Sequence, residues 1–366
     1  MYDVVIVGGG IAGCVLADKL NKVNFNVLVV ERSQRLKKDS GIVANRNVGK
    51  MIPKNFIEHT ITEMTLVSPF GSSVKLKTKD PFASIIDRQK LNKYLLDKIT
   101  GLVVYDHVKD VVWEDGFVSV VCDNKTYYGK MLVGCDGANS IIRKKINEHD
   151  GVFDDSNVVF GALAFDKIKT DSIHVYFNKL FSADFFAWTI PQNNEYGLMV
   201  GYKPMNFLNH FKKKFGYELN NVLVYPMIIG CKKSYTDRAL LVGESAGHNK
   251  PITGGGIDLA IVSVEYAFIT IKNAFRKNDF SSSFLKTYHN MWYKDFGSEI
   301  NRQLFLRKIY MKLNNEQIDD LFKIVKDGLE KTDYIEDYIE LSNLTKKLSY
   351  SRLFLWSLRN FGTIIK

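Results

Sequence analysis

Cysteine is scarce in this sequence, and its four cysteines, Cys14, Cys122, Cys135 and Cys231, stand singly inside apolar stretches with no CxxC spacing. Neither a zinc site nor a disulfide framework is indicated, so we expect reduced thiols and a cytoplasmic protein without a metal site. Proline is also rare, at 7 positions, while apolar residues make up 46% and charged residues 25%. This balance is typical of globular proteins and excludes a disordered, collagenous or coiled-coil chain.

Long apolar runs are absent as well. The longest uncharged run, from Val4 to Ala17, contains four glycines and is shorter than the roughly 20 residues of a membrane span. The N-terminus has no basic segment and no small-residue cleavage site, so we expect no signal peptide. Lys and Arg outnumber Asp and Glu by 50 to 40. This surplus suits an anionic cofactor, an anionic lipid head group, an acidic protein or a nucleic acid, and it does not choose among them.

The first motif lies at the N-terminus. The β-branched run Val4–Val7 predicts a buried parallel strand, and it leads directly into Gly8-Gly9-Gly10-Ile11-Ala12-Gly13 and a helical stretch. In such a GxGxxG turn the first glycine permits the tight bend, the second lets the backbone approach a pyrophosphate, and the third lets helix and strand pack closely. A second apolar strand ends in Glu31, whose carboxylate can accept hydrogen bonds from ribose hydroxyls. The alternative, a glycine-rich turn without a ligand, is weakened by this order of strand, glycines, helix, strand and acid.

Three further segments carry motifs. The alternating pattern around 69–72 predicts a hairpin, and Asp87-Arg88 predicts a helix start. The segment 131–143 predicts a buried strand that ends in Gly-Cys-Asp136-Gly, which places an acid at the carboxyl edge of a sheet, where ligands bind in open α/β folds. The third Gly-rich element, 239–258, again has the order strand, turn, glycine cluster and helix.

These motifs together resemble a known superfamily. GxGxxG with a distant Glu, DRxxL, GCDGxxSxxR and LLVGExAGxxxPxTGGGI, in this order, resemble the signature of the flavoproteins that include p-hydroxybenzoate hydroxylase. Within that superfamily the PxTGGGI ending is similar to the geranylgeranyl reductases, which saturate isoprenoid double bonds. The segments 185–191 and 296–308 resemble the substrate motif and the C-terminal helical region of those reductases. Flavin-dependent halogenases carry a similar Trp-x-Ile-Pro segment, although their chains are longer.

The resemblance implies an α/β fold with three parts: a Rossmann-like FAD-binding domain of the p-hydroxybenzoate hydroxylase type, an inserted antiparallel β-sheet substrate domain, and a C-terminal helical region. We expect the FAD domain to be discontinuous, over 1–65, 81–155 and 235–275. The β-rich substrate domain would comprise 66–80 and 156–234, and the helical region 276–366. Short β-rich runs between 161 and 201, with an amphipathic segment at 206–215, agree with a sheet.

The resemblance also assigns site residues. Those expected to bind FAD are Gly8, Gly10, Ala12, Gly13, Glu31, Arg32, Gly41, Arg88, Val108, Asp136, Glu244, Gly254, Gly255, Gly256 and Ile257. Those expected at the substrate are Phe186, Trp188 and Pro191, and an apolar tunnel lining would add Met199, Phe207 and Phe211, although any single one of these aromatics is more often core. Two departures stand out. Glu244 replaces the usual Asp, and Asp39 replaces a cysteine of the reductases.

The expected reaction is hydride transfer from reduced FAD to an alkene carbon, with a proton delivered to the other carbon. Because an isolated alkene is a poor hydride acceptor, an acid must assist, and Asp39 and His248 are the candidates by motif position. Each has a structural alternative: Asp39 as a solvent-facing turn residue and His248 as a cap of the loop. An FAD monooxygenase or halogenase acting on a small apolar substrate, or a non-catalytic flavin or lipid carrier, would share the cofactor motifs.

The expected partners are an isoprenoid lipid and an electron donor, either NAD(P)H or a ferredoxin-like protein, because only one dinucleotide motif is present. We expect no nucleic acid. The segment 346–366 carries five cations and no acid, and Phe354, Leu358, Phe361 and Ile365 follow helical spacing. Such a helix could rest on the inner membrane face as a peripheral anchor, or pack on the protein's own core.

Overall fold

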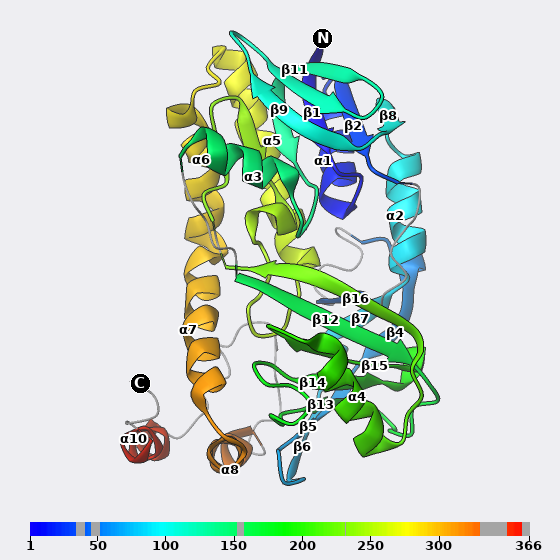
Figure 1. The fold of residues 1–366 in the computed structure, drawn as a ribbon, viewed down its shortest axis with the longest axis vertical. Helices are drawn as coiled ribbons and strands as arrows, with labels where there is room; N and C mark the ends of the chain where they lie inside the picture. Colours follow the sequence, from blue (N-terminus) through cyan, green and yellow to red (C-terminus); the bar gives the residue numbers. More distant parts are fainter. Residues whose placement is uncertain (34–40, 45–51, 152–156, 231, 330–349, 361–366) are drawn as a thin grey trace.

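The motifs lie on two large sheets that stand one above the other (Figure 1). The structure is a computed structural model that describes residues 1–33, 41–44, 52–151, 157–230, 232–329 and 350–360. The upper sheet has the strand order β17-β18-β11-β1-β2-β8, and β10 and β9 continue it from β11. Its strands are β1 (Tyr2–Val7), β2 (Val27–Glu31), β8 (Leu102–Tyr105), β9 (Val108–Trp113), β10 (Val118–Cys122), β11 (Thr126–Gly134), β17 (Tyr235–Thr236) and β18 (Ala239–Leu241).

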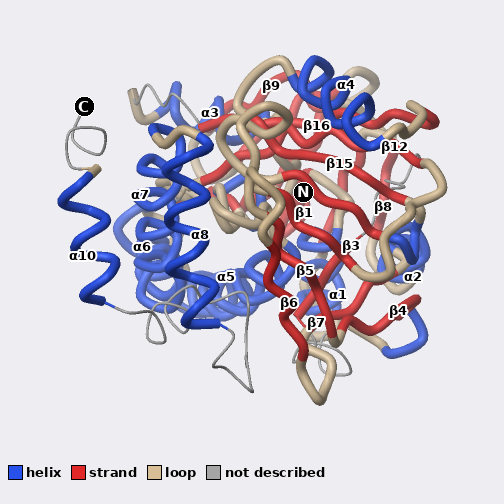
Figure 2. Tube along the Cα trace, turned by 90° about the horizontal axis from the view of Figure 1, so that it is seen from below, coloured by secondary structure: helices blue, strands red, loops and turns tan. Residues whose placement is uncertain are grey.

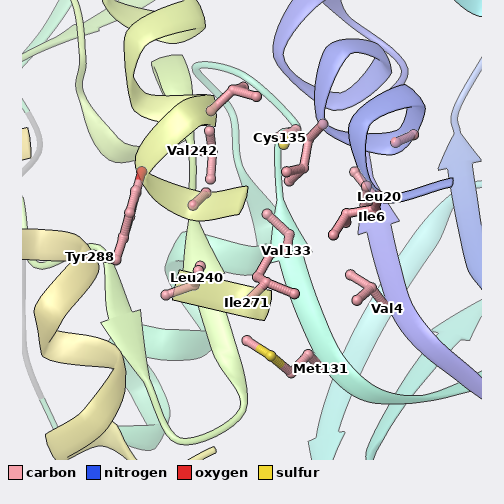
Figure 3. Close-up of a cluster of buried hydrophobic side chains, with 14 of the residues drawn as sticks. Val4, Ile6, Leu20, Met131, Val133, Cys135, Leu240, Val242, Ile271 and Tyr288 are labelled. Carbon is pink, nitrogen blue, oxygen red and sulfur yellow. The ribbon is translucent and has the colours of Figure 1, made fainter. Parts of the chain in front are cut away.

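The central strand β1 is apolar and buried from Val4 to Val7 because both of its faces are covered there. It pairs in parallel with β11 and β2, and parallel strands need helical crossovers that bury the sheet. One face packs against α1 (Ile11–Asn21), α5 (Ile257–Lys277) and α6 (Ser282–Trp292). Figure 3 shows this core, in which Val4, Ile6 and Val133 from the sheet belong to the same cluster as Ile271 and Tyr288 from the helices. The opposite face packs against α3 (Ile141–His149) and the β9–β10 hairpin.

The lower sheet has seven strands in the order β16-β12-β15-β14-β13-β5-β6. Its strands are β5 (Glu63–Val67), β6 (Ser73–Lys77), β12 (Asn157–Phe165), β13 (Ile173–Tyr176), β14 (Ala187–Ile190), β15 (Glu195–Val200) and β16 (Asn220–Ile229). One of its faces is covered by the amphipathic helix α4 (Pro204–Phe215). A three-stranded sheet, β3 (Gly41–Ala44), β7 (Ala83–Ile86) and β4 (Ile57–Ile61), is separate from both large sheets.

The C-terminal part of the chain is helical, as its pattern predicts. Helix α7 (Ser298–Lys312), orange in Figure 1, follows a five-residue π-helical segment after α6 and runs down the side of both sheets. Helices α8 (Asn315–Leu329) and α10 (Tyr350–Arg359) follow at the lower end, and Figure 2 shows them on the helical side of the molecule. No helix within the described residues is both long and apolar enough to span a membrane.

The structure differs from the expected strand pattern in two respects. Strand β16 was not anticipated, although it forms the edge of the lower sheet beside β12. The sheet is also not wholly antiparallel, because β5 of the predicted hairpin pairs in parallel with β13. The pairing joins residues 63–77 to a sheet built mainly from 157–229, so the assignment of this hairpin decides where one domain ends. The domain boundaries therefore stay a prediction.

Candidate functional site

The turn between β1 and α1 has the geometry that its glycines predict. Gly8 has a φ of 104°, and a Cβ at Gly8 would overlap the carbonyl of Cys135. A Cβ at Gly13 would overlap the carbonyl oxygen of Gly8, so helix and strand could not pack as closely with a larger residue. At Gly10, by contrast, a Cβ would meet no protein atom within 4 Å. Packing therefore requires Gly8 and Gly13, whereas Gly10 borders open space at the start of a helix.

Glu31 turns its carboxylate toward this turn. Its Oε2 accepts a hydrogen bond from the Gly9 N–H at 2.6 Å, and its Oε1 accepts one from the Ser33 N–H at 3.1 Å. Each oxygen keeps a second lone pair, so the carboxylate can still accept from a hydroxyl group. Asn92, on α2 (Arg88–Asp97), donates from Nδ2 to the Gly9 carbonyl at 3.1 Å. The sequence reasoning missed Asn92, although it directly follows the DRxxL segment.

The second motif is a capped helix start beside the first motif. Asp136 directly follows β11, and its carboxylate accepts from the Ser140 hydroxyl at 2.6 Å and from the Ile142 N–H at 3.2 Å. Burial raises the pKa of Asp136, while these hydrogen bonds act in the opposite direction. Arg143, also buried, donates to the carbonyls of Ser245 and Ala138 at 2.9 and 2.6 Å. The guanidinium thereby ties α3 to the third Gly-rich element.

The third Gly-rich element, 239–258, lies beside the first two motifs. Gly243 has a φ of 73°, and a Cβ there would lie 3.3 Å from the Cβ of Ala12. Glu244 accepts from Asn249 Nδ2 at 3.3 Å, and a Cβ at Gly137 would lie 3.5 Å from Glu244 Oε2. The three motifs, more than 230 residues apart in the sequence at their extremes, therefore meet at the carboxyl edge of the upper sheet.

The turn before α5 connects this edge to the lower sheet. A Cβ at Gly41 would lie 3.3 Å from Cδ1 of Ile257, so β3 lies against the start of α5. A Cβ at Gly254 would lie 2.6 Å from the sulfur of Met199 on β15. Gly255 is more open, because its Cβ would meet nothing nearer than Thr253 Oγ1 at 3.5 Å. Gly256 packs tightly under Asn249.

These features fit an FAD molecule. The open position at Gly10 borders free N–H groups at the start of α1, which is the arrangement that binds a pyrophosphate. Glu31 lies at the end of the next strand, where a ribose would be held. Gly255 leaves backbone accessible at the start of α5, next to the apolar face of the lower sheet. The residues present therefore suit the ADP half at one end and the flavin ring at the other.

The positions of four further residues predicted at the FAD or catalytic site add little to its geometry. Arg32 is exposed just after β2. Arg88 is the first residue of α2, whose N-cap Asp87 accepts from the Lys90 N–H. Val108 begins β9 with its side chain in the core. Asp39 lies outside the described residues.

His248 is completely buried between aromatic rings. Its ring centroid lies 4.5 Å from that of Trp292 and 5.2 Å from that of Phe296. Among the described residues neither ring nitrogen has a hydrogen-bond partner. Burial lowers the pKa of His248 to about 3, so the imidazole is uncharged at neutral pH. Its role as an acid stays a prediction that this low pKa does not favour.

The lower sheet presents an apolar face to the turn before α5. Trp188 lies across Gly197, where a Cβ would come within 2.6 Å of the indole ring, and Tyr225 lies across Gly161 in the same way. Trp188 Nε1 donates to Glu195 Oε1 at 2.9 Å. These aromatic rings belong to the same cluster of apolar side chains as Met199, which meets Gly254.

The predicted substrate residues are only partly brought together. Phe186 neighbours Trp188, with ring centroids 6.2 Å apart, and Phe177, with centroids 6.3 Å apart. Pro191 lies in the turn between β14 and β15. Phe207 and Phe211 belong to α4, whose cluster packs on the opposite face of the sheet. The predicted tunnel lining was therefore wrong for these two residues, because they belong to the helix that covers one face of the sheet, whereas Trp188 and Met199 lie on the other face.

A buried polar cluster fastens α7 to the lower sheet. Arg307 pairs with Asp184 at 2.9 Å, with 10% and 4% of their side chains exposed, and its guanidinium lies 4.2 Å from the ring centroid of Phe185. Lys179 Nζ donates to the carbonyls of Ala183 and Tyr310 at 2.5 and 2.8 Å. Burial lowers the pKa of Lys179 to about 8 and raises the pKa of Asp184. Nothing in the sequence pairs these residues, which are up to 131 positions apart.

Comparisons with known proteins agree with this geometry. A family profile described as lycopene cyclase protein matches residues 3–148. Digeranylgeranylglycerophospholipid reductase 2 of Methanothermobacter thermautotrophicus is 27% identical over 357 residues, covering 88% of this chain and 91% of the relative. Digeranylgeranylglycerophospholipid reductase 1 of Methanococcoides burtonii is 24% identical over 405 residues, covering 99% and 95%.

Solved structures share the fold. A geranylgeranyl bacteriochlorophyll reductase-like protein from Thermoplasma acidophilum superposes with a TM-score of 0.83 at 17% identity, covering 99% of both chains. The halogenase PltM, in a variant solved in complex with FAD, superposes with a TM-score of 0.67 at 12% identity, covering 98% of this chain and 90% of that one. These matches confirm the predicted fold class, and one of the matched proteins was solved with FAD bound. The chain is therefore an oxidoreductase that resembles the geranylgeranyl reductases and has the fold of flavin-dependent enzymes, as its three Gly-rich motifs predicted.

Proposed function

We propose that this protein reduces carbon–carbon double bonds in the geranylgeranyl chains of a membrane glycerophospholipid. The names of the relatives support isoprenoid reduction. The observation that carries the proposal to this chain is the contact between Met199, on the apolar face of the lower sheet, and Gly254, in the turn predicted to hold the flavin ring. An apolar chain that lies along this face meets aromatic rings on one side and that turn on the other.

Bound FAD would supply the hydride for the alkene carbon. The residues proposed to hold it are the open Gly10 turn and Glu31 at the ADP half, Glu244 at the ribityl chain, and Gly255, Gly256 and Ile257 at the ring. The rings of Trp188 and Tyr225 lie over Gly197 and Gly161, where they would exclude water from the apolar face. We keep Asp39 as the proposed proton donor, and the test is Asp39→Asn, which should slow alkene reduction and leave flavin binding intact. An unchanged rate of alkene reduction would indicate that Asp39 is a turn residue and does not donate the proton.

The function is tested by anaerobic reduction of the FAD-loaded protein, addition of a digeranylgeranyl glycerophospholipid in detergent, and mass analysis for added hydrogen. Trp188→Leu should retain FAD and lose most of the reduction, since it removes the ring beside the substrate. Its matched control is Phe207→Leu, which changes a half-buried aromatic of α4, the helix that covers the opposite face of the same sheet. This variant should reduce the lipid normally. A lipid that leaves the reaction without added hydrogen would contradict the proposal, and oxygen consumption coupled to NAD(P)H oxidation would favour the monooxygenase or halogenase alternative.

The electron donor is proposed to be NAD(P)H or a ferredoxin-like protein. Each is added anaerobically to the oxidised holoprotein, and bleaching of the flavin absorbance identifies the donor. If neither bleaches the flavin, this part of the proposal is wrong.

We also propose peripheral contact with a membrane through the C-terminal segment. The side chain of Leu358 on α10 is 53% exposed, although the helix is also fastened to α8, since Gln317 Nε2 donates to Asn360 Oδ1 at 2.8 Å. Each basic residue near an anionic surface contributes about 1 kcal/mol. The test compares flotation with anionic vesicles for the full chain and for a chain that ends before Lys346, at low and high salt. Equal flotation of the two would assign α10 to internal packing alone.

A further inference from the structure

A buried ion pair lies inside the turn that we propose to face the flavin ring. Lys250 Nζ lies 3.7 Å from Asp258 Oδ2, with only 7% and 11% of the two side chains exposed. Lys250 precedes the glycine cluster, and Asp258 is in the first turn of α5. Burying two charges costs more free energy than an apolar pair of similar volume would. An ion pair retained at such a position therefore invites a functional explanation.

The backbone places the lysine beneath the middle of the turn. Lys250 N–H donates to the Gly255 carbonyl at 3.0 Å, and Gly254 N–H donates to the Lys250 carbonyl at 2.9 Å. The Lys250 side chain then passes Gly255, with its Cδ 3.9 Å from the position of an added Cβ. Asp258 lies beyond the turn, within the helix. The stem of the lysine side chain thus runs past Gly255, the open glycine at which the flavin ring is proposed to lie, and carries the ion pair next to that position.

Charge near the N1 side of a flavin changes its electronics. Reduction of a flavin by two electrons with uptake of one proton leaves one negative charge, which is centred on N1 and the C2 carbonyl. A cation in a water-poor site stabilises that charge more strongly than a cation in water does. We propose that the Lys250–Asp258 pair sets the reduction potential of the flavin, with Lys250 favouring the reduced form and Asp258 limiting that effect. This inference rests on the proposed position of FAD, and both residues act as positioning residues through the electric field.

The test is the midpoint potential of the FAD-loaded protein, measured anaerobically against reference dyes at one pH. Lys250→Met should shift the potential to more negative values, and Asp258→Asn should shift it to more positive values. Sulfite, which adds to N5 and leaves the same negative charge at N1, should bind more weakly to the first variant and more tightly to the second. The control is Lys19→Met, which removes the Lys19–Glu265 ion pair at 2.9 Å between α1 and α5 and should leave the potential unchanged.

Lys250→Met alone leaves a buried carboxylate, so the charge of Lys250 is also removed in the Asp258→Asn background. The double variant should have a more negative potential than Asp258→Asn, because only the cation differs between them. Unchanged potentials in variants that hold FAD, or shifts of the same sign in both single variants, would show that the pair merely clamps the turn and would overturn the inference. A wild-type protein that holds no FAD would instead contradict the proposed cofactor site, and a holoprotein with the expected potentials that leaves lipid unreduced would contradict only the proposed substrate.

Discussion

The glycines of the first turn should separate cofactor binding from folding. At Gly10 the backbone has φ −75° and ψ −175°, which any residue adopts, and an added Cβ meets nothing within 4 Å. Gly10 is the N-cap of α1, and a non-capping residue there costs about 0.5–1 kcal/mol. The smaller freedom of the unfolded chain offsets about 0.4–1 kcal/mol of this cost. The free energy of unfolding of Gly10→Ala, measured without cofactor, should therefore change little.

In contrast, Gly13→Ala should lower the free energy of unfolding of the protein without cofactor. Its Cβ would overlap the Gly8 carbonyl and lie 3.3 Å from the Cβ of Cys135, so strand and helix must move apart. Overpacking of this kind costs up to about 3 kcal/mol, which at about 2 °C per kcal/mol for a large domain lowers the melting temperature by roughly 6 °C. Gly13→Ala should be the variant that loses stability in the absence of FAD.

The assay is thermal unfolding of the two apoproteins together with titration of FAD by fluorescence quenching. Gly10→Val, which projects a larger side chain into the same open space, should bind FAD at least about 100-fold more weakly, equivalent to about 2.8 kcal/mol. A Gly10 variant that binds FAD like the wild type would refute the assignment of this space to the pyrophosphate. A Gly10→Ala apoprotein as unstable as Gly13→Ala would refute the packing argument.

Three further predictions concern buried polar side chains. The pKa of His248 is lowered to about 3, so at acidic pH the unfolded chain binds a proton that the folded protein does not. The contribution of His248 to the free energy of unfolding should therefore be fully present above about pH 6.5 and should fall as the pH approaches 3. In denaturant titrations, His248→Phe should flatten this pH dependence, whereas a substitution of the exposed His107 should not. Arg307→Met should lower the free energy of unfolding by about 3 kcal/mol because it leaves the Asp184 carboxylate buried and unpaired. In a double-mutant cycle, the double variant with Asp184→Asn should regain part of that loss. A double variant that is less stable than Arg307→Met would contradict this prediction. Arg143→Met should lower the melting temperature because two buried carbonyl groups lose their hydrogen-bond donor, at about 1–3 kcal/mol each. It should also weaken FAD binding. Normal FAD binding would show that the hydrogen bonds from Arg143 on α3 to the third Gly-rich element are not needed to shape the site.

The parts of the site that follow from local sequence were predictable. Each Gly-rich element is a strand, a turn and a helix contiguous in the chain, and the conformation of the turn is determined by residues such as Gly8 and Gly243, whose positive φ values favour glycine. The order of the elements then placed Glu31 and Asp136 at strand ends. Sequence reasoning could not detect that Glu31 already accepts from Gly9 N–H, because that hydrogen bond depends on the turn and strand packing side by side.

What escaped prediction depends on contacts between distant segments. Strand β16 begins beyond α4 and pairs with β12 from 63 residues earlier in the chain, so no hairpin signal marks it. Phe211 and Trp188 are both aromatic residues of the β-rich region, and the hydrophobic pattern does not say that Phe211, on α4, packs against one face of the sheet while Trp188 packs with Met199 on the other. The pair of Asp184 and Arg307 joins a loop to a helix 123 residues later, and although Arg307 lies in the segment 296–308, no motif connects it with Asp184.

The order of the strands has a consequence for how this protein is made on the ribosome. Strand β18 pairs with β11 in the upper sheet, yet the whole run from β12 to β16 separates them in the chain. N-terminal segments emerge first during synthesis, so β1, β2 and β11 can pair while α5 and α6, which cover their inner face, have not yet been synthesised. The nascent chain therefore has only α1 on this apolar face, and lacks the cover of α5 and α6, until after β16, the last strand of the lower sheet, has been translated. Because the turn proposed to hold the flavin ring directly precedes residue 257, we expect capture of the cofactor only in the last third of translation, and we expect a nascent chain that pauses before residue 257 to be prone to aggregation.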